Sequence, residues 1–321
     1  MSEVRAQMSE AIGQGMEAPI LPSGLMPRGV EWGTLVLILI CYTAWFAVIF
    51  WLAALSMALA VVLAGVLIAF HSSLCHEALH GHPFRNRLLN EALMALPLNL
   101  VIPYGRFRDT HLAHHQDERL TDPFDDPESN FMCPDIWRGL APWKRAVLRM
   151  NNTLLGRMLL GPLIGQICFM AGDWQLVRQG DRRVIADWLL HVAGSALVVW
   201  LVLRAPMPVW AYAIAAYLGL ALLKIRTFLE HRAHEEVRGR TVVIEDRGPL
   251  ALLFLNNNLH IVHHMHPGVP WHALPRLYHR HRALYQAANR AYVFPSYRQI
   301  FRDYFLRAKD PVPHPLWQKG K

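Results

Sequence analysis

Three short blocks of histidines are the residues of this 321-residue sequence that could do chemistry together. They are His76-Glu77-Ala78-Leu79-His80, His111-Leu112-Ala113-His114-His115 and His260-Ile261-Val262-His263-His264. Residues three and four positions apart share one face of a helix, so each block can direct its imidazoles to one side. Eight imidazoles exceed the four ligands of a tetrahedral zinc site, and neutral imidazole suits iron, copper, nickel or zinc. The pattern therefore predicts a centre of two transition-metal ions.

A ninth imidazole is expected just after an apolar segment, where Glu230-His231 is followed by His234. We predict His231 as the additional ligand, with Glu230 supporting it. Spacing alone does not choose between the two rings, so His234 remains the alternative.

Polar residues beside the blocks are candidates for holding the ligand rings. A carboxylate or amide that accepts the second ring N–H of a ligand histidine fixes its tautomer. We assign this supporting role to Asp109, Asp117 and Glu77. The Asp-rich run from Asp122 to Glu128 is interpreted, for most of its residues, as a solvated loop with turn prolines.

The asparagines of residues 256–258 precede the third block. One of them, Asn257, is a candidate for holding a metal-bound water. Helix capping is an equally good explanation, because asparagine is a favoured N-cap residue.

The composition indicates a membrane protein. The chain is 53% hydrophobic and 17% charged, against about 25% charged in soluble proteins. Residues 33–70 carry no charged side chain, which is enough for a hairpin of two spans turning near residues 54–56. A second hairpin is expected from residues 188–203 and 209–225. We therefore predict an all-α integral membrane fold with four transmembrane helices and a cytoplasmic histidine-rich cap that holds the dimetal site.

Two other apolar stretches, residues 92–104 and 153–171, are predicted to be interfacial or re-entrant. The first is short and carries two prolines, and the second contains Arg157 and Pro162. Both features are unusual for a simple span.

The basic residues predict the orientation. Of 32 Lys and Arg, 13 lie in residues 72–187 and 16 follow from Lys224 onward, while none lies between the first two expected spans. The positive-inside rule then places both termini and the site in the cytoplasm, with the inner membrane as the expected location. The net charge of +8 is thus a topology signal and does not indicate nucleic acid. With an even number of spans between blocks, all three blocks emerge on the same face.

Domain organisation is expected to be simple. Residues 1–30 form an N-terminal cytoplasmic segment, residues 31–305 the membrane domain and residues 306–321 a C-terminal tail. The four cysteines show no CxxC motif, so neither structural disulfides nor an iron–sulfur cluster is expected.

The blocks, of form HxxxH, HxxHH and HxxHH and separated by two hydrophobic hairpins, closely resemble the integral-membrane fatty acid desaturase and hydroxylase superfamily. The resemblance covers roughly residues 35–305. Residues 121–128, 226–231, 264–267 and 270–271 are similar to a bacterial branch that includes dihydrorhizobitoxine desaturase.

The resemblance implies a non-haem diiron enzyme that uses dioxygen to introduce a double bond into an acyl chain or lipid-like substrate. It implies no catalytic residue apart from the metal ligands. Those ligands would be His76, His80, His111, His114, His115, His231, His260, His263 and His264. The chain has no haem, flavin or ferredoxin motif of its own, so an external electron donor such as ferredoxin or cytochrome b5 is expected as a partner.

Other functions fit part of the pattern. A hydroxylase or ketolase of the same superfamily would use the same metals. The motif HExxH, formed here by His76, Glu77 and His80, is also the signature of zinc metalloproteases, although such a protease has no use for two HxxHH blocks. A non-enzymatic membrane protein is the third alternative, and eight imidazoles directed together argue against it.

Overall fold

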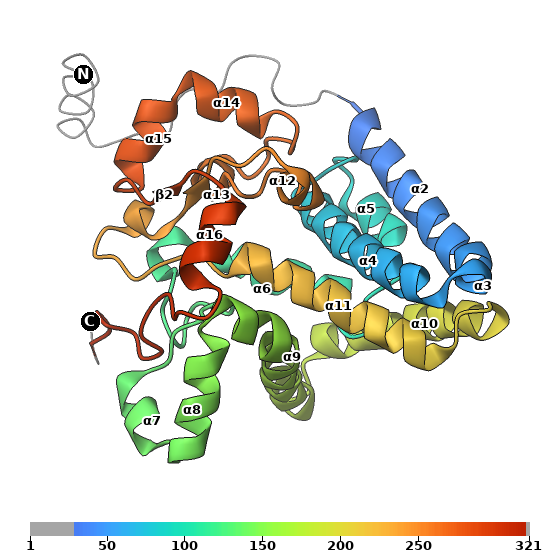
Figure 1. The fold of residues 1–321 in the computed structure, drawn as a ribbon, viewed down its shortest axis with the longest axis horizontal. Helices are drawn as coiled ribbons and strands as arrows, with labels where there is room; N and C mark the ends of the chain where they lie inside the picture. The colour runs from blue at the N-terminus through green and yellow to red at the C-terminus, as the bar shows by residue number, and fades with distance from the viewer. Residues whose placement is uncertain (1–28, 319–321) are drawn as a thin grey trace. The chain divides into compact units, whose positions relative to one another are not determined.

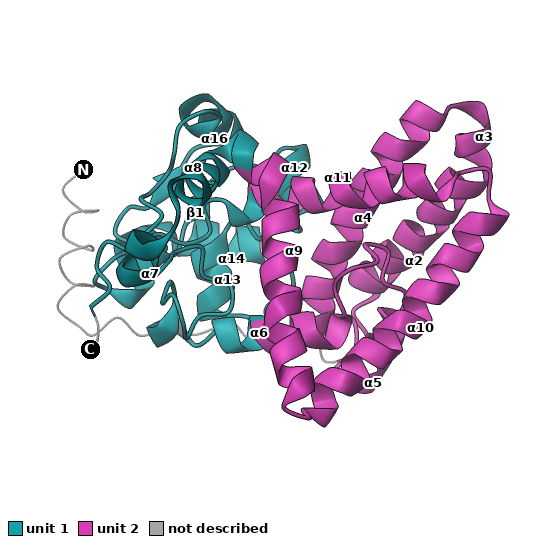
Figure 2. Ribbon diagram, turned by 90° about the horizontal axis from the view of Figure 1, so that it is seen from below, with its two compact units in different colours: residues 1–28, 111–156, 226–321 teal, residues 29–110, 157–225 magenta. Residues whose placement is uncertain are grey.

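The computed structural model describes residues 29–318. The N-terminal cytoplasmic segment expected over residues 1–30 lies almost entirely outside the described residues. Residues 29–318 are mostly helical, and they form two compact units (Figure 2). Among the described residues, unit 1 comprises residues 111–156 and 226–318, and unit 2 comprises residues 29–110 and 157–225.

Unit 2 is built from the long apolar helices. Its elements are α2 (Trp32–Ala47), the π-helical turn η1 (Val48–Leu52), α3 (Ala53–Leu55), α4 (Met57–Leu79), α5 (Arg87–Leu93), α6 (Tyr104–His114), α9 (Leu154–Arg178), α10 (Arg182–Arg204) and α11 (Val209–Thr227). One end each of α6, α9 and α11 belongs to unit 1. Ser56 separates α3 from α4 in extended conformation, and its side chain accepts from Leu59 N. The first hairpin therefore turns where the sequence predicts. Figure 1 shows α2 and α4 side by side.

Five helices among the described residues are long and apolar enough to cross a membrane: Trp32–Leu55, Met57–Leu79, Leu154–Arg178, Arg182–Arg204 and Val209–Thr227. The sequence analysis expected four. The additional helix is α9, whose region was expected to be interfacial or re-entrant. It is continuous over 25 residues with Pro162 inside it. The count of four spans is thus not confirmed by length and hydropathy.

The core of unit 2 depends on close helix packing. The ring N–H of Trp45 donates to Tyr212 Oη at 3.1 Å, and Tyr212 Oη donates to the carbonyl of Leu98 at 2.8 Å. Gly219 allows α11 to approach α4, since a Cβ there would lie 2.9 Å from the carbonyl oxygen of Gly65 and 2.7 Å from the Ile68 side chain. These contacts leave no room for a side chain at this crossing.

Unit 1 contains short helices and the only sheet among the described residues. Its elements are η2 (Asp117–Arg119), α7 (Pro134–Gly139), α8 (Pro142–Asn151), η3 (Val237–Arg240), β1 (Val243–Ile244), α12 (Pro249–Leu253), α13 (His260–Met265), α14 (Leu274–Arg280), α15 (Arg282–Ala288), β2 (Val293–Phe294) and α16 (Tyr297–Tyr304). Strands β1 and β2 pair in parallel, with Val243 opposite Val293.

The segment leading into β1 connects two parts of the chain that carry histidines. Val242 N donates to the carbonyl of Glu230 at 3.1 Å, and the Val242 carbonyl accepts from Ile261 N at 3.2 Å. Around this segment packs an apolar core that includes Val243, Ile261 and Tyr285. The backbone beside His231 and the start of α13 are therefore fixed to the same strand.

The α4–α11 crossing gives a first prediction. Gly219→Ala places a methyl group against backbone, so we expect the free energy of unfolding to fall by about 1–3 kcal/mol, as for overpacked cores. A thermal scan of the detergent-solubilised protein should therefore show a lower Tm. Gly172→Ala in α9 is the matched control, because a Cβ there meets nothing within 4 Å. An unchanged Tm for Gly219→Ala would show that this crossing is not tightly packed.

Candidate metal centre

The second and third histidine blocks lie in the same unit, each at a helix end. His111 and His114 occupy the last turn of α6, and His115 follows directly. His260, His263 and His264 lie on α13. The 3.6-residue period turns each triplet to one side of its helix.

Four imidazoles form a first group within unit 1, from His114, His231, His260 and His264. One ring nitrogen of each lies within 4.8 Å of those of the others. His231 Nε2 is 2.9 Å from His114 Nε2 and 3.1 Å from His260 Nε2. We call these residues the His231 group.

Three more imidazoles form a second group within unit 1. His115 Nε2 lies 3.0 Å from His111 Nε2 and 3.1 Å from His263 Nε2. We call these residues the His115 group. Unit 1 thus brings together seven of the nine histidines that the sequence analysis singled out.

The first block belongs to unit 2. His76 lies in the last turn of α4, and His80 is the residue that ends this helix. Their ring centroids are 4.9 Å apart, as expected for positions i and i+4. Glu77 is buried, with Oε1 3.9 Å from His76 Nδ1.

The carboxylates that hold the second block were missed in the sequence. His114 Nδ1 donates to Asp126 at 2.7 Å, and His111 Nδ1 donates to Glu128 at 2.9 Å. The solvated-loop interpretation is wrong for both residues, and Asp126 is only 6% exposed. The turn starts at Asp122, whose side chain accepts from Phe124 N and Asp125 N. The turn prolines were visible in the sequence, but its direction back toward α6 was not.

Glu230 and Asn257 support the third block as a pair. Asn257 Oδ1 accepts from His260 Nδ1 at 3.2 Å, and its Nδ2 donates to Glu230 at 3.1 Å. Glu230 also forms an ion pair with Arg226, whose Nε lies 3.1 Å from Glu230 Oε1. Capping is not the role of Asn257, because the N-cap of α13 is Leu259, without a side-chain cap.

The other candidates lie elsewhere. His234 is partly exposed and accepts from Glu236 N at 3.0 Å, so the structure brings His231 and not His234 into a histidine group. Asp109 accepts from Arg108 Nε at 2.9 Å and Arg183 at 2.7 Å. The side chain of Asp117 lies outside the described part of the chain.

Burial decides most protonation states of the His231 group. Burial, together with neighbouring histidines, lowers the pKa values of His231, His260 and His264 well below the usual range, so these rings are neutral. Burial also acts on His114, but the carboxylates of Glu128 and Asp126 outweigh it and raise its pKa to about 9. A metal bound at His114 therefore displaces a proton.

The hydrogen bonds leave ring nitrogens that suit a cation. His260 donates from Nδ1, so the Nε2 atom of its neutral ring carries a lone pair. His114 also donates from Nδ1, and its Nε2 carries a lone pair once its extra proton is displaced. Both face His231 Nε2, which carries at most one hydrogen and cannot satisfy two acceptors. A transition-metal ion that accepts several of these lone pairs fits the donor set. His115 Nε2 likewise lies between His111 Nε2 and His263 Nε2, so a second cluster of imidazole nitrogens is assembled there.

These imidazole groups could hold metal ions, and the chain has several helices long and apolar enough to cross a membrane, a combination typical of membrane metalloproteins. The family model for fatty acid desaturases matches residues 49–296, which is more than half of the chain. The chain therefore belongs to the fatty acid desaturase family, in agreement with the resemblance of its histidine blocks, and the family is one of oxidoreductases. No curated protein matches the chain.

The carboxylate at position 126 gives a second prediction. Asp126→Asn replaces one acceptor oxygen with an NH2 group, so the amide cannot accept from both Thr121 N and His114 Nδ1. We expect the metal affinity to fall about 10- to 100-fold, as for other supporting residues. The measurement is metal retained per chain after dialysis against a graded chelator. Asp125→Asn, at an exposed neighbour, should behave like the wild type, and equal retention by both variants would contradict the assigned role.

Proposed function

We propose that this protein is a dioxygen-dependent, non-haem diiron desaturase that introduces a double bond into an acyl chain or lipid-like substrate. The observation that carries the proposal is the pair of buried histidine groups within unit 1, in a chain of the fatty acid desaturase family. A hydroxylase or ketolase of the same family is the alternative, because it would use the same ligands.

The proposed ligands of one iron are His114, His231, His260 and His264, which form the His231 group. The other iron would be held by His111, His115 and His263, completed by His76 and His80 of the first block. The second part of this assignment rests on the order of the three blocks in the family pattern. When bound, the two irons would supply the activation of dioxygen that oxidation of an unactivated C–H bond requires.

Three polar residues beside the proposed ligands keep their rings in one tautomer. Asp126, Glu128 and Asn257 accept from the Nδ1 atoms of His114, His111 and His260. This leaves Nε2 of each ring as the donor to a metal. No residue apart from the ligands is assigned a catalytic role.

The partners follow from what the chain lacks. Its four cysteines are free and lie far apart in the sequence, and no flavin or haem motif is visible. Two electrons per turnover would come from an external donor such as ferredoxin or cytochrome b5. The bacterial branch that includes dihydrorhizobitoxine desaturase remains part of this proposal, as does a membrane location with the site in the cytoplasm.

Parity supports our assignment of four membrane crossings. His114 and His264 lie in one group, so the chain between them must cross the membrane an even number of times. Three candidate spans, α9, α10 and α11, lie in that interval. We assign α9 to the interface, because it carries Arg157 and Asp173 among its apolar residues. Helices α10 and α11 form the second hairpin.

Metal content tests the proposed cofactor. Protein expressed with iron and purified in detergent should contain about two irons per chain by elemental analysis. In host lipid extracts, mass spectrometry should show a product that has lost two hydrogens. A product that has gained one oxygen would instead identify a hydroxylase. About one zinc without iron would overturn the proposal and favour the HExxH protease.

Two variants separate the oxidase from the protease. His263→Ala removes a proposed ligand of the His115 group, so we expect product formation to fall by more than about 100-fold. A protease centred on His76 would instead keep most of its proteolytic activity in this variant. Glu77→Gln should abolish a protease, because its glutamate is the general base. Product yield and proteolysis are measured on equal amounts of folded protein. Retained lipid oxidation in His263→Ala would contradict the diiron assignment.

Reporter fusions test the topology. Four crossings put both termini on one side, whereas five would put them on opposite sides. A reporter active only in the cytoplasm and one active only outside it should therefore give the same result at both ends. Opposite results at the two ends would overturn the four-span arrangement.

A further inference from the structure

Residues 309–314 form what we call the C-terminal segment, which lies beyond residues 49–296, the part matched by the family model. It begins with a buried lysine. Lys309 Nζ donates to the backbone carbonyl of His231 and lies 3.2 Å from Asp310 Oδ2, and its side chain is only 9% exposed. Lysine is almost never buried unless it is paired, so this contact is a specific one.

The other end of the segment reaches the second histidine block. His314 Nε2 lies 3.1 Å from Thr121 Oγ1, and both residues are buried. Thr121 N donates to Asp126 Oδ2 at 2.8 Å, and Asp126 Oδ1 accepts from His114. A continuous chain of hydrogen bonds therefore runs from His314 to the ring of His114.

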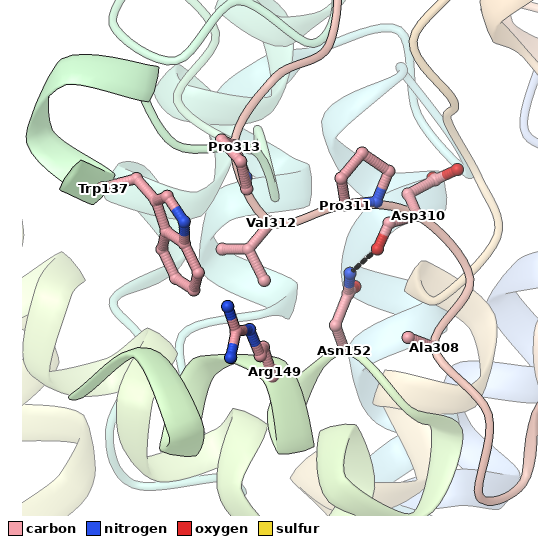
Figure 3. Close-up of a pocket in the computed structure, with 8 residues that line it drawn as sticks. All are labelled: Trp137, Arg149, Asn152, Ala308, Asp310, Pro311, Val312 and Pro313. Atoms are coloured by element: carbon pink, nitrogen blue, oxygen red, sulfur yellow. Dashed lines mark hydrogen bonds between the residues drawn. The ribbon is translucent and has the colours of Figure 1, made fainter. Parts of the chain in front are cut away.

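The segment itself is held by backbone contacts at separate points. Asn152 Nδ2 donates to the Asp310 carbonyl (Figure 3), and Lys309 N donates to the Asn152 carbonyl at 3.2 Å. Met132 N donates to the Val312 carbonyl at 3.0 Å, and His314 N donates to the Met132 carbonyl at 2.9 Å. Between these points, Pro311 to Pro313 line a cavity of about 250 Å³ together with Trp137 and Arg149.

The two ends of the segment thus act on two ligands of the same group. His231 is reached through its carbonyl, and His114 through Thr121 and Asp126. The Nε2 atoms of these two ligands are 2.9 Å apart.

We propose that the C-terminal segment is a positioning element of the metal centre, in which Lys309 and His314 hold His231 and His114 in place for the metal of the His231 group. This inference rests on the proposed metal centre and extends it to residues outside the family match. Lys309 and His314 are positioning residues, since neither is proposed to touch the metal.

The test measures metal loss and not activity. Iron-loaded full-length protein in detergent is incubated with a chelator, and iron per chain is followed over time. In Lys309→Met, which keeps the length of the side chain but not the donor, we expect about one of the two irons to be lost about 10-fold faster than in the wild type, in line with the effect of supporting residues on metal affinity. Lys309→Arg keeps a donor and should restore slow loss.

Arg307→Met is the matched control, because Arg307 is an exposed cation two residues earlier. It should lose iron at the wild-type rate. A merely structural role for the lysine would lower the Tm of Lys309→Met without changing which iron is lost, whereas the proposal expects selective loss of one iron.

Two further variants test the inference if Lys309→Met does not fold. Asn152→Ala removes the side-chain contact to Asp310, and His314→Ala removes the contact to Thr121, so both should speed the loss of the same single iron. Wild-type loss rates in all three variants would overturn the inference while leaving the metal centre intact. A wild-type protein that binds no iron would overturn both, so the two failures are distinguishable.

Discussion

The structure depends on the close approach of buried imidazole nitrogens that cannot all be satisfied once His114 has lost its extra proton. His231 Nε2 lies within hydrogen-bond distance of two other Nε2 atoms, and their rings already donate from Nδ1 to Asp126 and Asn257. Lone pairs brought this close in a buried site repel unless a proton or a cation lies between them. The surrounding fold must therefore be stiff enough to hold the rings together before a metal arrives, and rigid support of this kind is what metal sites require.

Unit 1 provides that stiffness from several directions. The residue before β1, Val242, is bonded both to Glu230 and to α13, so the backbone beside His231 and the ring of His260 share one support. The turn after α6 returns Asp126 to His114, and the buried Arg226 neutralises Glu230 beside Asn257. Burial raises the pKa of Glu230 despite that arginine. The supporting groups come from segments that are distant in sequence, and each fixes a different ring.

The grouping of the histidine rings was predictable from the sequence, as were Glu230 and Asn257 beside the third block, but Asp126 and Glu128 were not. Helical spacing alone grouped His111, His114 and His115, because the period of the helix acts over a few residues. It did not reveal that Asp126 folds back onto α6, since the direction of a turn depends on tertiary packing. The length of α9 was missed for a related reason: Pro162 reads as a helix breaker, yet the helix continues through it.

The same contrast explains why metal retention can depend on residues outside a family match. A ligand must be a histidine at a given place, so ligand blocks form a pattern that recurs and is matched over residues 49–296. A support needs only to offer a donor or acceptor at the right position, and many residues at many chain positions can do so. Lys309 acts on His231 through a backbone carbonyl, whose chemistry is the same for every residue type. Such a contact leaves no motif, so it becomes visible only when the folded chain brings residues 231 and 309 together.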